Sequence, residues 1–174
     1  MGLVLLFTLP QVTGNEYVLA LGASFAAMSV LSGGLNLVYG YTGLLSFAQV
    51  GFFGIGGYAA ALLVTEQDWP FWAAIAAAGI LAALVGLLIG YSSLRLSRHA
   101  FAIVSLSFAL LCMIVARDWV ELTRGSMGIP GLPTPTINLP GGWRWRVVQP
   151  ADFYYLLMGF AVIAHALIYL VVTS

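Results

Sequence analysis

The 174-residue sequence is poor in charge: only 7% of its residues are charged, and lysine is absent. A soluble domain has roughly 25% charged residues, so this composition excludes an ordinary soluble protein. Six arginines balance six acidic residues. A net charge of zero provides no electrostatic basis for nucleic-acid binding. Nothing in the sequence resembles a G-x-x-x-x-G-K-[ST] phosphate loop, so the chain is not expected to bind ATP.

Cysteine and histidine are also scarce. The single cysteine, Cys112, excludes an intramolecular disulfide and a cysteine-rich metal site. The two histidines, His99 and His165, are far apart in the sequence. We therefore predict no catalytic residue, no metal and no cofactor. His165 lies inside an apolar stretch, where a polar side chain normally faces protein or a water-filled path. An interhelical hydrogen bond is its ordinary role, and a place on a substrate path is the alternative.

Apolar residues, by contrast, make up 61% of the chain. They fall into five stretches that approach the roughly 20 residues of a membrane-spanning helix. The sequence therefore predicts an all-α fold, a polytopic transmembrane bundle with about five full spans. The apolar segment from Gly2 to Phe7 is too short to cross a membrane, and we interpret it as the tail of a clipped helix or an interfacial segment. The five predicted spans cover residues 17–39, 49–65, 70–91, 99–116 and 153–172.

The charges lie in the connections between the spans and predict an orientation. Arg95 and Arg98 lie in a short link without acidic residues, which places that link in the cytoplasm. Glu66 and Asp68 lie in the preceding link, which fits the outer face. Counting from these links puts residues 117–152 outside and the last residue in the cytoplasm. Residues 1–174 are expected to form a single transmembrane domain that contains this extracytoplasmic loop.

The outer loop, residues 117–152, is unusually long for a connection. Long loops without regular structure are often functional, so this loop either docks a partner or connects two spans passively. A short helix is expected near Asp118 to Glu121. Trp143 and Trp145 precede the return to the membrane, as interfacial aromatic residues do. In the third span, Gly86 and Gly90 form a GxxxG pair that favours close helix packing.

A glycine-rich segment from Gly33 to Gly57 separates the first two spans. Glycines there permit a break or a sharp turn, and irregular backbone at membrane depth occurs only where it is buried in protein or lines a cavity. Broken helices recur in transporters because the freed backbone groups can face a substrate. A plain cytoplasmic turn is the alternative, and the residues favour neither. The candidate substrate-path residues are Asn36, Tyr41, Thr42, Gly43, Ser46, Gln49 and, with less support, His165.

The segment NLVYGYTGLLSFAQVGFFGIGGYAAALL, from Asn36 to Leu63, resembles permeases of branched-chain amino acid ABC importers, the LivM-like subunit. LRLSRHAFAIVSLSFA, from Leu94 to Ala109, and LTRGSMGIPGLP, from Leu122 to Pro133, extend the resemblance in the same order. The resemblance implies half of a transport path in the cell inner membrane. It also implies four kinds of partner: a second permease, two cytoplasmic ATPases, an extracytoplasmic binding protein and membrane lipid. The loop residues expected to meet the binding protein are Gly125, Gly128, Ile129 and Pro130.

The chain differs from the resembled family in length. The family's basic cytoplasmic loop, which docks on the ATPase, and further helices are not found before Ser174, so we expect a partial permease. Two alternatives stay open: a permease for urea or a short amide, and a structural membrane subunit that does not transport by itself.

Overall fold

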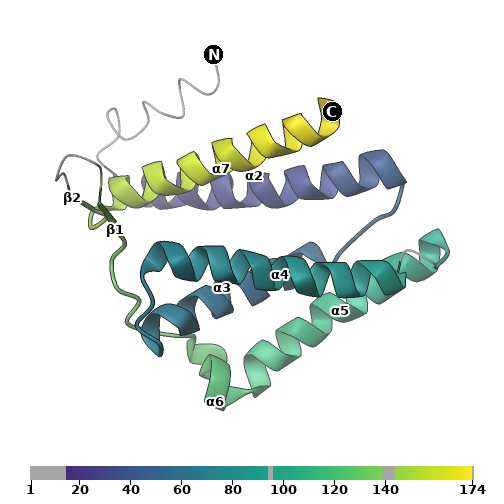
Figure 1. Ribbon diagram of the computed structural model, residues 1–174, viewed down its shortest axis with the longest axis horizontal. Helices are drawn as coiled ribbons and strands as arrows, with labels where there is room; N and C mark the ends of the chain where they lie inside the picture. Colours follow the sequence, from purple (N-terminus) through teal and green to yellow (C-terminus); the bar gives the residue numbers. More distant parts are fainter. Residues whose placement is uncertain (1–14, 94–95, 139–143, 174) are drawn as a thin grey trace. The chain divides into compact units, whose positions relative to one another are not determined.

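The computed structural model describes residues 15–93, 96–138 and 144–173. Arg95, Trp143 and the N-terminal apolar segment lie outside the described residues. The chain forms two compact units, residues 1–37 with 134–174 and residues 38–133. The elements follow one another along the chain (Figure 1) as α2 (Glu16–Thr42), α3 (Gln49–Thr65), α4 (Phe71–Ser93), α5 (Arg98–Asp118), α6 (Val120–Thr123), a 3-10 turn η1 (Gly125–Met127), strands β1 (Thr136–Asn138) and β2 (Arg144–Arg146), and α7 (Pro150–Thr173).

Each of the five predicted spans is a helix, with ends within a few residues of those predicted. Four of these helices, α2, α4, α5 and α7, are long and apolar enough to cross a membrane. The fifth, α3, has 17 residues and is shorter. Large apolar side chains such as Leu87, Leu88 and Leu170 are exposed on the helix surfaces. Because such surfaces are stable in lipid and costly in water, the fold is the predicted polytopic helical bundle of a membrane protein.

The first unit is a pair of helices, α2 and α7, which lie side by side (Figure 1). Its core consists of Leu19 and Ala26 from α2 with Tyr154, Met158 and Ala161 from α7. Gly22 lets the ring of Tyr154 approach, since a Cβ built there would lie 2.5 Å from the Tyr154 ring.

The two helices of this pair run in the same direction. Gly22 faces Tyr154, and about three helical turns further along both helices Gly33 faces His165 and Ile168. Contacts therefore advance along both helices together, which defines a parallel pair.

The second unit consists of α3, α4 and α5 with the short elements that follow α5. Helices α3 and α4 form an antiparallel hairpin, and its tight turn includes Asp68 at a φ of 52°. Phe52 near the start of α3 approaches Gly86 near the end of α4, at 3.7 Å from a built Cβ. A Cβ built at Gly90, the other half of the GxxxG pair, would meet no atom of another described element within 4 Å. Ala74 and Ala78 of α4 are buried, as a packing face rich in alanine predicts.

The long outer loop contains more regular structure than its composition indicates. The short helix α6 begins two residues later than the helix expected there, and η1 follows it directly. Strands β1 and β2 pair in antiparallel fashion, with Ile137 opposite Trp145. The amide of Val147 donates a 3.0 Å hydrogen bond to the carbonyl of Pro135 and extends this pairing.

Candidate functional site

The glycine-rich segment contains a break between two helices. Helix α2 ends at Thr42, residues 43–47 belong to neither helix nor strand, and α3 begins at Gln49. The Thr42 hydroxyl donates to the carbonyl of Val38 at 2.7 Å and accepts from the amide of Leu44 at 3.2 Å. Gly43 has a φ of 65°, and its amide closes the last helical turn on Tyr39 at 2.9 Å. This is a helix end with a left-handed residue that favours glycine.

Arg98, the first residue of α5, lies beside this helix end. Its guanidinium carbon and one nitrogen are 3.5 Å from the position that a Gly43 Cβ would occupy. The carbonyl end of a helix carries partial negative charge, so a cation there is favourable. Arg98 thus stabilises the end of α2 from the start of another helix.

A second contact, further along α5, fixes the segment between the two helices. The amide of Phe47 donates a 3.1 Å hydrogen bond to the Ser105 hydroxyl, which itself donates to the carbonyl of Ala102 at 2.9 Å. Ser105 is buried at 4% relative exposure. The partly buried amide of Phe47 thus has a side-chain partner on α5 in place of a partner within a helix or strand.

The third contact joins α3 to the same face of α5. A Cβ at Gly51 would lie 2.9 Å from the Phe108 ring and 3.2 Å from the Cys112 sulfur, so only glycine permits this approach. The rings of Phe52 and Phe108 also meet, with centroids 5.2 Å apart. Arg98, Ser105, Phe108 and Cys112 recur at the spacing of one helix face.

The candidate path residues divide between the two units. Five of them gather at the break: Tyr41 and Thr42 in the last turn of α2, Gly43 and Ser46 in the segment between the helices, and Gln49 at the start of α3. Ser46 is the most buried of the five, at 9% relative exposure.

Asn36 and His165 lie on the two helices of the other unit. The Nδ1 atom of His165 is 2.8 Å from the carbonyl of Ala161, one turn earlier on α7. Because a carbonyl can only accept, Nδ1 carries the proton and Nε2 is an acceptor in the neutral ring. Nε2 lies 3.4 Å from the position of a Gly33 Cβ. His165 therefore packs against α2, while Asn36 is exposed one turn after Gly33.

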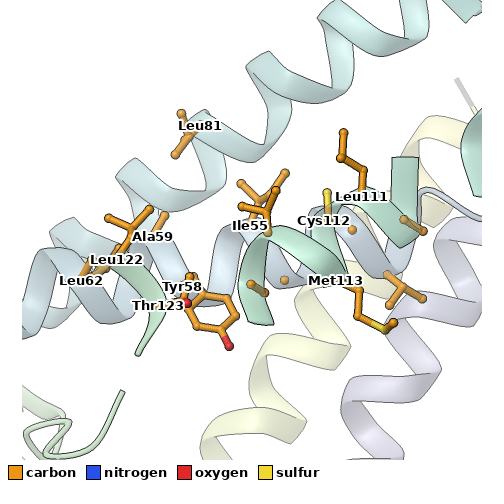
Figure 2. A pocket seen from close by; sticks show the side chains of 16 residues that line it. Ile55, Tyr58, Ala59, Leu62, Leu81, Leu111, Cys112, Met113, Leu122 and Thr123 are labelled. Atoms are coloured by element: carbon orange, nitrogen blue, oxygen red, sulfur yellow. The ribbon is translucent and has the colours of Figure 1, made fainter. Parts of the chain in front are cut away.

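A largely apolar cavity of about 460 Å³ opens in the second unit, between α3, α5 and the end of α6, with Leu81 of α4 also in its lining (Figure 2). Ile55, Leu62 and Met113 are among the side chains that line it, and Tyr58 and Thr123 bring hydroxyl groups to it. None of the described residues that line this cavity is acidic or basic. A bare charge there would be poorly solvated, so the cavity suits hydrocarbon groups.

The outer-loop residues expected to meet a partner lie around η1. Gly125 is buried, and its Cβ would lie 3.1 Å from the carbonyl of Arg117. Gly128 and Pro130 line a second cavity, and Ile129 between them is half-buried. Gly125 therefore holds the loop against α5, while the other residues are at or near the surface.

Sequence reasoning missed the residues of α5 that hold the break. Arg98 was used only to orient the chain, and Ser105, Phe108 and Cys112 were assigned no role at the break. The signal that could have found them is their recurrence on one face of a helix, at three- and four-residue steps. Within the described ranges, no group of three histidine, cysteine or acidic residues could hold a metal ion.

Four helices of spanning length define a polytopic membrane protein, and a break in the helices separates two of its predicted spans. The family model described as "Branched-chain amino acid transport system / permease component" matches residues 17–174, and the chain belongs to this family. The chain is 40% identical over 108 residues to the high-affinity branched-chain amino acid transport system permease protein LivM of Escherichia coli, and 37% identical over 122 residues to LivM of Salmonella typhimurium.

These alignments cover 62% and 66% of this chain but only 25% and 29% of the two relatives. The aligned part of the chain thus spans little more than a quarter of the curated relatives it matches. No solved structure matches the chain. The family match confirms the resemblance found in the sequence, and the relatives are transport permeases.

Proposed function

We propose that this chain is a membrane subunit of an ABC importer for branched-chain amino acids and forms part of the translocation path. The family and both relatives are named for branched-chain amino acid transport. The observation that carries the proposal is the helix break at residues 43–47, whose backbone is held by α5.

The contacts along α5 support a break that reaches into the membrane. Gly43 lies at Arg98 and Phe47 at Ser105, seven residues later, so the segment between the helices advances about 10 Å along α5. If Arg98 is at the cytoplasmic interface, as its charge predicts, Phe47 lies well inside the hydrocarbon region. The freed backbone groups there can face a substrate.

This arrangement also accounts for the shortness of α3. A helix of 17 residues is about 25 Å long, less than the roughly 30 Å of hydrocarbon. The residues before it supply the missing length, so residues 43–65 make one complete crossing. The chain then crosses the membrane five times.

The directions of the packed helices support five crossings. In an alternating chain, α2 and α7 are the first and fifth crossings and must run in the same direction; they do. If α3 did not cross the membrane, α2 and α7 would be the first and fourth crossings and would have to run in opposite directions. Helices α3 and α5, as second and fourth crossings, also run in the same direction.

With Arg98 inside, the start of α5 faces the cytoplasm and the loop around η1 lies outside. Two ATPase subunits would then act from the Arg98 side, and an extracytoplasmic binding protein would meet Gly125, Gly128, Ile129 and Pro130. A second permease completes the path, and the assembly belongs in the inner membrane.

The test is uptake of labelled leucine by cells in which the gene is deleted and then restored. Uptake should fall on deletion and return on restoration, while uptake of labelled urea should not change. Unchanged leucine uptake in the deletion strain, with other leucine carriers removed, would reject this substrate assignment. Loss of urea uptake alone would favour the amide importer instead.

A further inference from the structure

The outer loop contains a second cavity whose lining differs from that of the apolar one. Its volume is about 490 Å³ and it is open to solvent, since Val120 and Met127 in its lining are 63% and 92% exposed. It is lined by Val120, Glu121, Arg124, Met127, Gly128 and Pro130. An acid and a base thus line one small space together with three apolar side chains.

The backbone that carries these side chains is fixed by its contacts with α5 and α6. Thr123 is buried at 4% exposure; its hydroxyl donates to the carbonyl of Trp119 at 2.8 Å and accepts from the amide of Gly125 at 3.1 Å. The amide of Arg124 closes α6 on the carbonyl of Val120 at 3.0 Å. The charged residues are therefore presented from a defined turn.

Arg124 itself has a left-handed backbone, with a φ of 60°. A non-glycine residue pays roughly 1 kcal/mol for this conformation. Glycine would adopt this left-handed conformation more easily, but position 124 is occupied by arginine and the glycine follows at position 125. The conformation places Arg124 on the same short turn as Glu121, at the rim of the cavity.

The two charges do not neutralise each other. The ion pair among the described residues joins Arg117 and Asp118, at 3.5 Å, and both of these side chains are exposed. Glu121 and Arg124 form no such pair with one another in the part of the chain that the structure describes. Each charge is therefore able to meet an opposite charge on a ligand.

The ligand that matches this lining carries both charges close together and an apolar group beside them. We propose that this cavity is a receiving site for a zwitterionic α-amino acid with an aliphatic side chain, which rests on the importer function proposed above. Arg124 would bind the α-carboxylate through paired N–H groups, and Glu121 would bind the α-ammonium. Val120, Met127 and Pro130 would contact the side chain. A neutral amide such as urea would leave both charges without a counterpart.

The position of the cavity suits transfer of the ligand from outside. It shares the loop that is expected to meet the binding protein, through Gly128 and Pro130. The apolar cavity lies on the other side of α6, where Leu122 and Thr123 line it. A ligand in the charged cavity is thus separated from the apolar cavity only by the short helix α6.

The test measures binding of tritiated leucine to the purified chain in lipid nanodiscs, with no binding protein present, at concentrations up to the millimolar range. Isoamylamine, which keeps only the ammonium, and 4-methylpentanoate, which keeps only the carboxylate, should each compete at least tenfold less well than leucine. Urea should not compete. Glu121→Gln and Arg124→Gln should each weaken leucine binding about tenfold.

Arg117→Gln and Asp118→Asn are matched controls, because they remove charges of both signs just outside the cavity and should leave binding unchanged. The absence of leucine binding to the unaltered chain, or equal binding by all four variants, would overturn the proposal. The proposal would also be overturned if the Glu121 and Arg124 variants reduced uptake by the whole importer but left leucine binding to the purified chain unchanged. That result would mean that the two charges contact the binding protein and not leucine. Leucine uptake in cells separates the two proposals. If uptake is normal but the purified chain does not bind leucine, only this site is rejected. If the purified chain binds leucine but cells show no uptake through it, only the importer function is rejected.

Discussion

The close approach of α3 to α5 at Gly51 gives a prediction whose size follows from the structure. Replacing Gly51 with alanine adds a methyl group 2.9 Å from the Phe108 ring and 3.2 Å from the Cys112 sulfur. Both distances are shorter than a normal carbon contact of about 3.5–4.0 Å. Either α3 moves away from α5 or the ring leaves its rotamer.

Two opposing effects determine the net result. Alanine is favoured over glycine inside a helix by about 1 kcal/mol, whereas forcing an extra methyl group into a packed site costs about 1–3 kcal/mol. We therefore expect Gly51→Ala to destabilise the chain by about 1 kcal/mol. By the size scaling of unfolding enthalpy, this lowers the melting temperature by about 2–4 °C.

The assay is thermal unfolding of the purified chain in detergent, followed by circular dichroism. Gly54→Ala is the matched control, because it lies in the same helix and no atom lies within 4 Å of its built Cβ. It should stabilise the chain by about 0.5–1 kcal/mol. The double variant Gly51→Ala with Phe108→Leu should recover part of the loss. Equal effects of the two alanine substitutions, or no coupling with position 108, would refute the packing argument.

Three further predictions concern the break and the helix pair. Gly43→Leu should reduce leucine uptake at normal membrane levels, because a left-handed backbone costs a bulky residue about 1–2 kcal/mol; uptake is measured against the amount of protein in the membrane. Ser105→Ala should lower stability by about 0.5–1.5 kcal/mol in the same thermal assay, because the partly buried Phe47 amide loses its acceptor. Gly22→Ala should separate α2 from α7 and destabilise the first unit by about 1–3 kcal/mol, since its methyl group would overlap the Tyr154 ring.

Each of these substitutions has a control in the same element. Gly43→Asn tolerates the left-handed conformation and should keep most uptake; equal loss in both variants would contradict the backbone explanation. Ser107→Ala removes an exposed hydroxyl from α5 and should be neutral, so an equal effect at both serines would argue against the Phe47 hydrogen bond. Gly159→Ala on α7 meets nothing within 4 Å, and a loss as large as that at Gly22 would show that any added methyl group disturbs this pair.

The sequence predicts the helices well because membrane spans are set by apolar length. The first predicted span, residues 17–39, differs from α2 by one residue at its start and three at its end. This success has a simple physical cause: in lipid every backbone group must be satisfied within the segment, so a long apolar run has few alternatives to a helix. The same reasoning does not apply to α6 and the paired strands, which have only three or four residues each and show no periodicity.

The break was predicted only as one of two readings, a helix break or a cytoplasmic turn. Residues 33–57 show that the backbone is free to bend, but they do not show what holds it. The holding groups come from α5, more than fifty residues later, through the Arg98 guanidinium and the Ser105 hydroxyl. A contact between residues so far apart depends on how helices pack, and a single sequence does not reveal that pairing.

The order of contacts along α5 links the shape of the break to its chemistry. Arg98 meets a helix end, Ser105 meets a free amide, and Phe108 meets a glycine, each about one or two helical turns after the last. Charge, hydroxyl and ring thus follow one another from the predicted cytoplasmic end inward, as the backbone that they contact changes from helix end to irregular chain to helix. A shift of α5 along its axis by one turn would mismatch all three contacts together. The break is therefore stable only in one register of α5, and under the proposed importer function a movement of that helix along its axis would open or close the break.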